Sequence, residues 1–210
     1  VGAAERFELL QLLEGSEHAL SADESTWYIT WCEEAARLAH GGGAYAAALD
    51  LQLRAITQLG PVAWRDQPAR MFELHLRAAE NALVIDRTGL VDQLLDSAWA
   101  HHPTPMERVR AMRVLGNRWW TRQDQRGGIA EMQSLLRELG ERFPTKPTGY
   151  HVARELMATR MAIRGMEPEQ FVTAAPLRDE LVRAKLDTML SAVHLAYTTE
   201  PLTHVLLVLR

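Results

Sequence analysis

Residues 128–144 read GIAEMQSLLRELGERFP, and the spacing of their apolar side chains indicates the class of fold. The apolar positions fall three or four residues apart, at Ile129, Met132, Leu136, Leu139 and Phe143. Because an α-helix completes a turn about every 3.6 residues, this spacing places all of these side chains on one helix face. We predict a helix over residues 127–143 that ends at Pro144, since proline cannot continue a helix.

The same helical period recurs along the chain, whereas the period-two alternation typical of strands is almost absent. Ser21 and Thr104 each stand three residues before a glutamate, as in a capping box, and Pro105 follows Thr104. Met71, Leu74, Ala78, Ala82 and Ile85 form one stripe on a helix, and Phe72, Leu76, Ala79 and Leu83 form a second. That helix is expected to be packed on two sides. The predicted helices span residues 3–14, 23–40, 44–59, 66–86, 88–101, 105–122, 127–143, 149–164, 177–197 and 201–210.

Short loops between consecutive helices predict antiparallel helical hairpins. The second helices of successive hairpins begin near residues 44, 89 and 128, so the length of the repeat varies. A regular tetratricopeptide array instead repeats about every 34 residues. We therefore predict an all-α fold in which antiparallel hairpins stack as a degenerate tetratricopeptide-like α-solenoid. The predicted organisation is a single domain over 1–210, with about four hairpins in 1–164, a connector over 165–176 and terminal helices over 177–210.

Composition and charge argue against several classes of partner. Hydrophobic residues make up 47% of the chain and charged residues 24%, and the formal net charge is −4. Arginines and carboxylates are interspersed along the chain, so no cationic field attracts nucleic acid or anionic lipid. No apolar run is long enough for a membrane span. We expect protein partners, with no nucleic acid and no membrane, and leave open a homo-oligomer.

The ends of the chain and its single cysteine bear on its origin. Cys32 has no second cysteine for a disulfide, which fits a reducing compartment, and the N-terminus lacks the features of a secretion signal. We expect a cytoplasmic protein. The chain begins at Val1 without a methionine and stops inside the apolar pattern of residues 207–210, which we interpret as a piece of a larger protein.

No catalytic or metal-binding motif is apparent. His151 and Glu155 lie four residues apart and could supply two metal ligands, although a hydrogen-bonded surface pair is the competing interpretation. His101 and His102 adjoin a helix end, where imidazoles favour a capping role over metal binding. Cys32 is followed by two glutamates, which disfavour a thiolate and favour a buried structural role. The sequence therefore predicts no enzyme, no cofactor and no metal.

Tryptophan and arginine side chains supply the candidate contact residues. Trp27 and Trp31 lie four residues apart, and Trp119 and Trp120 are adjacent. Because consecutive helix positions differ by about 100°, one of Trp119 and Trp120 must point away from the face that the other buries. An exposed tryptophan can anchor a partner, although tryptophans also fill gaps between helices. The densest basic stretch, a solvated face or a site for an acidic partner, comprises Arg108, Arg110, Arg113, Arg118, Arg122 and Arg126.

A longer set of packing residues carries a family resemblance. It comprises Trp27-Tyr28 before Glu34-Ala35-Ala36, the run 39–49, Ala55-Ile56, the turn 59–64, the run 74–80, Leu195-Ala196-Tyr197, Pro201-Leu202 and the run 206–209. Together these residues, over roughly 25–210, resemble the helical region that follows the ATPase module in large bacterial signalling proteins. Such proteins combine the ATPase with protein kinase, sensor, histidine kinase, cyclase or DNA-binding domains. No phosphate-binding Gly-x-x-x-x-Gly-Lys-Ser/Thr motif occurs here, so the resemblance implies architecture and not nucleotide binding.

Three functions remain as hypotheses. The first is a non-catalytic scaffold for protein–protein or interdomain contacts, using Trp119, Trp120, Arg118, Arg122, Trp27 or Trp31. The second is a small-molecule sensor with a pocket between helices lined by Trp27, Trp31, Trp119 or Trp120. The third is an enzyme with an unusual site around His151 and Glu155.

Overall fold

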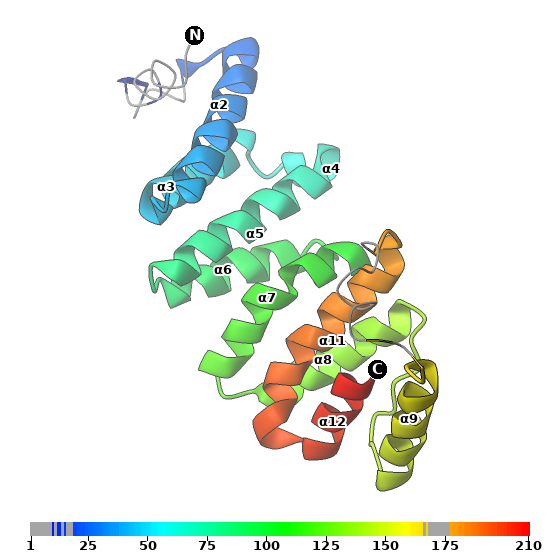
Figure 1. Cartoon of the computed structure of the whole chain (residues 1–210). Coiled ribbons are helices and arrows are strands. Elements are labelled where there is room, and N and C mark those ends of the chain that lie inside the picture. Colours follow the sequence, from blue (N-terminus) through cyan, green and yellow to red (C-terminus); the bar gives the residue numbers. More distant parts are fainter. Residues whose placement is uncertain (1–9, 11, 14, 16–18, 166, 168–176) are drawn as a thin grey trace. The chain divides into compact units, whose positions relative to one another are not determined.

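The computed structural model describes residues 10, 12, 13, 15, 19–165, 167 and 177–210, and this part of the chain is helical with no strand (Figure 1). The predicted all-α class is confirmed. None of the described helices combines the length and apolar character needed to cross a membrane. Most of the predicted helix 3–14 and of the connector 165–176 lies outside the described residues.

The chain divides into two compact units, Val1–Pro103 and Thr104–Arg210. The prediction of one continuous domain over residues 1–210 stays a prediction. The first unit contains α2 (Ala22–Gly41), α3 (Tyr45–Leu59), α4 (Ala63–Asp66), α5 (Pro68–Val84) and α6 (Thr88–Trp99). In this unit α2 packs on α3, α3 on α5 and α5 on α6, and the short helix α4 lies against α5.

The core of the first unit lies between these consecutive helices. Tyr28 and Cys32 of α2 are fully buried, and they pack with Leu51 of α3 and Leu74 of α5. Helix α5 is packed on two sides by α3 and α6, as its two apolar stripes predict. Cys32 is therefore a buried structural residue, as expected from its surroundings in the sequence.

The second unit contains α7 (Pro105–Thr121), α8 (Gln125–Glu138), α9 (Gly149–Ala162), α11 (Glu180–Thr199) and α12 (Pro201–Leu209). Helix α11 is central, because it packs against α7, α8 and α12, while α9 packs against α12 (Figure 1). At the centre of the unit, Met132 of α8 and Leu195 of α11 are almost completely buried. The terminal helix pair thus completes the core around α7 and α8 instead of extending it as a separate hairpin.

The turns after α2, α5 and α7 share one backbone geometry, which also occurs after α8, at Gly140. Gly43, Asp86 and Gln123 have positive φ angles of 78°, 59° and 57°. In each turn the next residue donates its backbone N–H to a carbonyl five residues earlier, from Ala44 to Ala39, from Arg87 to Ala82 and from Asp124 to Trp119. These bonds close the C-termini of α2, α5 and α7 in the manner of a Schellman motif. The turns at Gly43, Asp86 and Gln123 lie 43 and 37 residues apart.

The predicted helix starts are confirmed more closely than the ends. Ser21 with Glu24 and Thr104 with Glu107 form capping boxes, and Pro105 is the first residue of α7. The predicted end of the helix 127–143 is wrong, because α8 stops at Glu138. Gly140 then adopts a φ of 80°, and the N–H of Glu141 donates to the carbonyl of Leu136. The left-handed glycine therefore ends the helix before Pro144.

Candidate functional site

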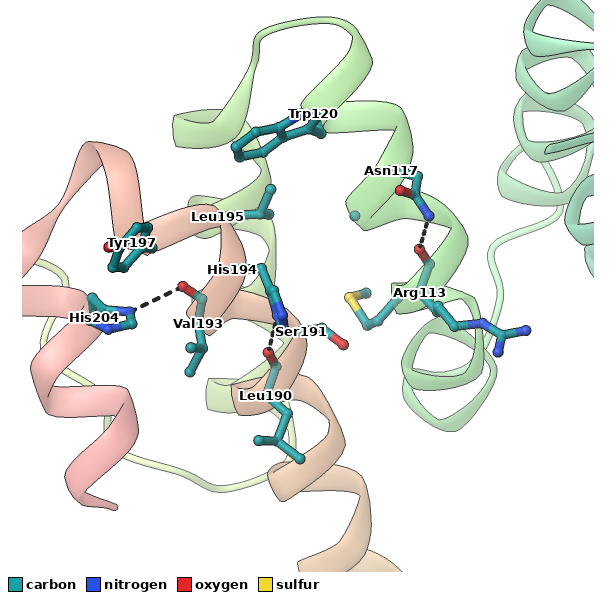
Figure 2. A pocket seen from close by; sticks show the side chains of 12 residues that line it. Arg113, Asn117, Trp120, Leu190, Ser191, Val193, His194, Leu195, Tyr197 and His204 are labelled. Carbon is teal, nitrogen blue, oxygen red and sulfur yellow. Dashed lines mark hydrogen bonds between the residues drawn. The ribbon is translucent and has the colours of Figure 1, made fainter. Parts of the chain in front are cut away.

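A pocket of about 750 Å³ lies in the second unit, between α7 and α11 and beside α12 (Figure 2). Its lining residues are Met112, Arg113, Gly116, Asn117, Trp120, Leu190, Ser191, Val193, His194, Leu195, Tyr197 and His204. Most of these contribute apolar surface, with a small number of polar groups among them. This mixture is typical of sites that bind an apolar group in a fixed orientation.

Helical periodicity places the lining side chains in two facing rows. On α7 the row is Met112, Gly116 and Trp120, each four residues from the next. On α11 it is Leu190, His194 and Tyr197, spaced four and three residues apart. Residues three or four apart lie on the same helix face, so the two rows form the walls of a groove about two turns long.

Trp119 and Trp120 take opposite roles at this groove. A Cβ atom on Gly128 would lie only 2.7 Å from Cδ2 of the Trp119 ring and 2.8 Å from Cδ1 of Leu195, so Trp119 packs directly over Gly128. Trp120, the next residue along the helix, lines the groove instead and is 51% exposed at its edge (Figure 2). The inference that one member of the pair faces away from the packed side is thus confirmed.

Gly116 forms an open part of the groove wall. A Cβ atom at this position would have no atom within 4 Å apart from its own helix backbone. Glycine in a helix interior costs about 1 kcal/mol relative to alanine, and no packing against the described residues requires it here. The missing side chain widens the groove between Met112 and Trp120.

Two histidines border the groove with defined ring orientations. The Nδ1 atom of His194 lies 3.3 Å from the carbonyl oxygen of Leu190, and Nδ1 of His204 lies 3.2 Å from that of Val193 (Figure 2). A carbonyl oxygen only accepts hydrogen bonds, so Nδ1 is the donor in both rings. The His204 ring also meets Tyr197 edge-on, with centroids 5.2 Å apart. Both Nε2 atoms are consequently available as acceptors when the rings are neutral.

The other candidate contact residues lie elsewhere. Trp27 and Trp31 belong to the first unit, where their rings, 4.5 Å apart, are partly buried against the core around Tyr28. Arg118, on α7, and Arg122, which caps its C-terminus, do not line the groove. Of the six residues proposed from sequence, Trp120 alone lines this pocket. The α11 wall was not found from sequence, although its exposed apolar positions were a possible signal.

One arginine of the basic stretch is not a solvated side chain. The guanidinium of Arg108 lies 2.7 Å from a carboxylate oxygen of Glu131 and 2.9 Å from both oxygens of Glu138. These ion pairs connect α7 with α8 and hold a side chain that is largely shielded from solvent. Arg108 therefore contributes to packing within the unit.

His151 and His101, two of the histidines considered as metal ligands, make contacts at helix ends instead. His151 accepts the backbone N–H of Thr148 at 3.1 Å, at the start of α9, while Glu155 approaches the guanidinium of Arg210 at 3.4 Å. Among the described residues, no group of three His, Cys, Asp or Glu side chains is placed to hold a metal ion. His101 donates from Nδ1 to the carbonyl of Ser97 at the end of α6, which confirms its expected capping role.

A second cluster, in the first unit, joins His75, Trp64 and His101. The Trp64 ring stacks on His101 with centroids 4.0 Å apart and lies 4.9 Å from the His75 ring. His75 donates from Nδ1 to the carbonyl of Met71 at 2.8 Å, and its Nε2 lies 3.3 Å from Ser97 Oγ. Burial lowers the pKa of His75 below its ordinary value of 6.5, the bond to Met71 opposes this shift, and His101 adds to it.

This lowered pKa predicts a specific loss of stability in acid. The folded chain binds fewer protons at His75 than the unfolded chain does. The contribution of His75 to the free energy of unfolding is therefore fully present above about pH 6.5, and it is lost as the pH falls from there toward the pKa of the folded state. We expect urea unfolding to show a steeper fall in free energy from about pH 7 to about pH 5 for the native chain than for His75→Gln. His101→Gln should keep most of the slope, because burial is the main cause. Equal slopes for native chain and His75→Gln would contradict the assignment.

No protein-family model, curated protein or solved structure matches this chain.

Proposed function

We propose that this chain is a non-catalytic helical-repeat scaffold that binds a segment of a partner protein or of a neighbouring domain. The observation that carries the proposal is the apolar groove between α7 and α11, with the half-exposed Trp120 at its edge and the vacant side-chain position of Gly116 in its wall. An exposed tryptophan beside a vacant apolar space is typical of the anchor sites that dominate protein interfaces.

The repeated turns at Gly43, Asp86 and Gln123 support an array of related hairpins. On this basis we assign the chain to a degenerate tetratricopeptide-like α-solenoid, in keeping with the resemblance to helical regions of bacterial ATPase-type signalling proteins. In such a protein the scaffold would be cytoplasmic. It would transmit binding at the groove through small shifts between stacked hairpins.

A small-molecule sensor is the second candidate, because the groove volume falls within the range of about 300–1,000 Å³ typical of ligand pockets. The exposure of the groove edge favours a protein segment. Trp120, Leu190 and Tyr197 are all at least half exposed, whereas ligand pockets bury most of a bound small molecule. A protein segment would cover these side chains from outside.

Selection from a random peptide display library tests the proposal, because it offers the groove many different segments at once. We expect selected peptides to carry a large apolar anchor residue. Trp120→Ala should weaken binding at least about tenfold, and Gly116→Leu should abolish it by filling the groove. Leu38→Ala, which removes a similarly exposed side chain on α2 of the first unit, serves as the matched control and should bind normally.

Two results would contradict the scaffold assignment. One is that no selected peptide responds to Trp120→Ala or Gly116→Leu. The other combines the selection with a second measurement, a fragment screen by ligand-observed NMR. In that result Gly116→Leu removes the binding of small-molecule fragments but leaves peptide binding unchanged. The second result would transfer the assignment to the small-molecule sensor.

A further inference from the structure

Helix α9 has one packed face and one exposed face. On the packed face, Thr159 donates from Oγ1 to the carbonyl oxygen of Leu209 at 2.7 Å, and Glu155 approaches Arg210. These contacts fix α9 against α12, beside which it lies in Figure 1. No residue of α9 is fully buried, so much of the helix surface faces solvent.

The exposed face carries a stripe of large apolar side chains, Tyr150, Met157 and Met161. They are 72%, 58% and 71% exposed. At about 100° per residue, the three lie within about 40° of one another and almost opposite Thr159. Side chains of this size, gathered on one face and turned away from the core, form an apolar surface that the described part of the chain does not cover.

Arginines border this stripe on both sides. By the same helical geometry Arg160 lies along one edge and Arg154 along the other, Arg164 follows just after the end of α9, and all three are exposed. Glu155 is the sole acidic residue in the sequence of α9, and it lies 3.4 Å from Arg210 on the packed side and 3.8 Å from Arg154. The exposed face is thus cationic as well as apolar, in a chain whose net charge is −4.

The residue types on this face are those enriched in protein interfaces. Tyrosine, methionine and arginine are over-represented at protein–protein contacts, whereas lysine, aspartate and glutamate are depleted. Methionine also adapts its flexible side chain to different apolar partners. An anionic membrane surface fits less well, because an interfacial helix needs a continuous apolar face to enter the lipid, and here Arg160 separates the stripe from Leu156, the other large apolar side chain exposed on α9.

We propose that the exposed face of α9 binds an acidic amphipathic helix of a partner protein. Apolar side chains of the partner would cover Tyr150, Met157 and Met161, and its carboxylates would pair with Arg154, Arg160 and Arg164. Paired guanidinium and carboxylate groups set the orientation and the partner's charge, while the apolar stripe supplies most of the buried area. This surface shares no residue with the Trp120 groove, so it stands independently of the function proposed for that groove.

Three synthetic helical peptides of about 18 residues, or about five turns, test the proposal. One carries a Leu and Phe stripe flanked by glutamates, the second has the same stripe flanked by lysines, and the third scrambles the first. Fluorescence anisotropy with the native chain should give at least about tenfold tighter binding of the acidic amphipathic peptide than of the other two. Binding should weaken as salt is added.

Charge reversal provides the decisive variant. We expect the triple variant Arg154→Glu, Arg160→Glu and Arg164→Glu to prefer the lysine-flanked peptide. Tyr150→Ala should weaken binding of the acidic peptide. The matched control reverses the exposed Arg37, Arg87 and Arg126 and should keep the native preference. Circular dichroism melts of each variant confirm folding. The Trp120→Ala and Gly116→Leu variants should bind these peptides normally, which separates this surface from the groove.

The proposal is overturned if the native chain does not distinguish the peptides, or if both triple variants bind them alike. Vesicles containing phosphatidylglycerol provide the remaining comparison. Cosedimentation that depends on Arg154, Arg160 and Arg164, without binding of the acidic peptide, would assign this face to an anionic membrane instead of a protein.

Discussion

Replacing Gly128 by alanine should lower the free energy of unfolding of the second unit by about 2–3 kcal/mol. The added Cβ would lie 2.7 Å from the Trp119 ring and 2.8 Å from Leu195, distances at which carbon atoms cannot remain. Gly128 lies where α7, α8 and α11 meet, and although the Leu195 methyl group can turn aside, the close Trp119 atoms belong to a rigid indole ring. The indole must shift, and the packing of α8 against the other two helices must loosen.

The same substitution at Gly116 provides the control. Both glycines lie within helices of the second unit, but a Cβ at Gly116 meets open space. Gly116→Ala should therefore raise the free energy of unfolding by about 0.5–1 kcal/mol through improved helix propensity. Urea unfolding, with hydrogen exchange of residues 104–210, compares the two. A Gly128→Ala variant as stable as Gly116→Ala would show that Trp119 does not pack as described.

Local signals explain which parts of the fold could be predicted. The capping boxes at Ser21 and Thr104 depend on residues three positions apart, and the turn at Gly43 depends on a glycine that tolerates a positive φ. At Gln123 the same turn forms without such a residue, so composition gives no warning there. The end of α8 was misplaced because Phe143 continues the apolar spacing while Gly140 ends the helix.

The candidate site shows where sequence reasoning stops. Adjacent helix positions were sufficient to predict that Trp119 and Trp120 face different ways. The opposite wall comes from α11, about 70 residues further along the chain, and no local pattern pairs Leu190 or His194 with α7. Likewise, Arg108 appears in the sequence as one of several arginines, and its pairing with Glu131 becomes visible only once α7 and α8 are packed.

Asn81 lies at the centre of a buried polar network in the first unit. Its Oδ1 accepts from His40 Nδ1 at 2.7 Å, and its Nδ2 donates to Gln52 Oε1 at 2.8 Å. Asn81 is fully shielded from solvent and Gln52 nearly so. Asn81→Leu, which is similar in size, should lower the free energy of unfolding by about 3 kcal/mol, because the Gln52 amide then stays buried without its partner.

A double substitution separates the loss of hydrogen bonding from a misfit of shape. Asn81→Leu combined with Gln52→Leu removes both buried amides of this network, and His40, which is exposed, can bond to water instead. Because replacing both partners by apolar groups removes the desolvation cost, the double variant should be more stable than Asn81→Leu alone. Urea denaturation of the native chain and the three variants measures the coupling energy. If Gln52→Leu adds a further loss to that of Asn81→Leu, the network contributes through packing and not through satisfied hydrogen bonds.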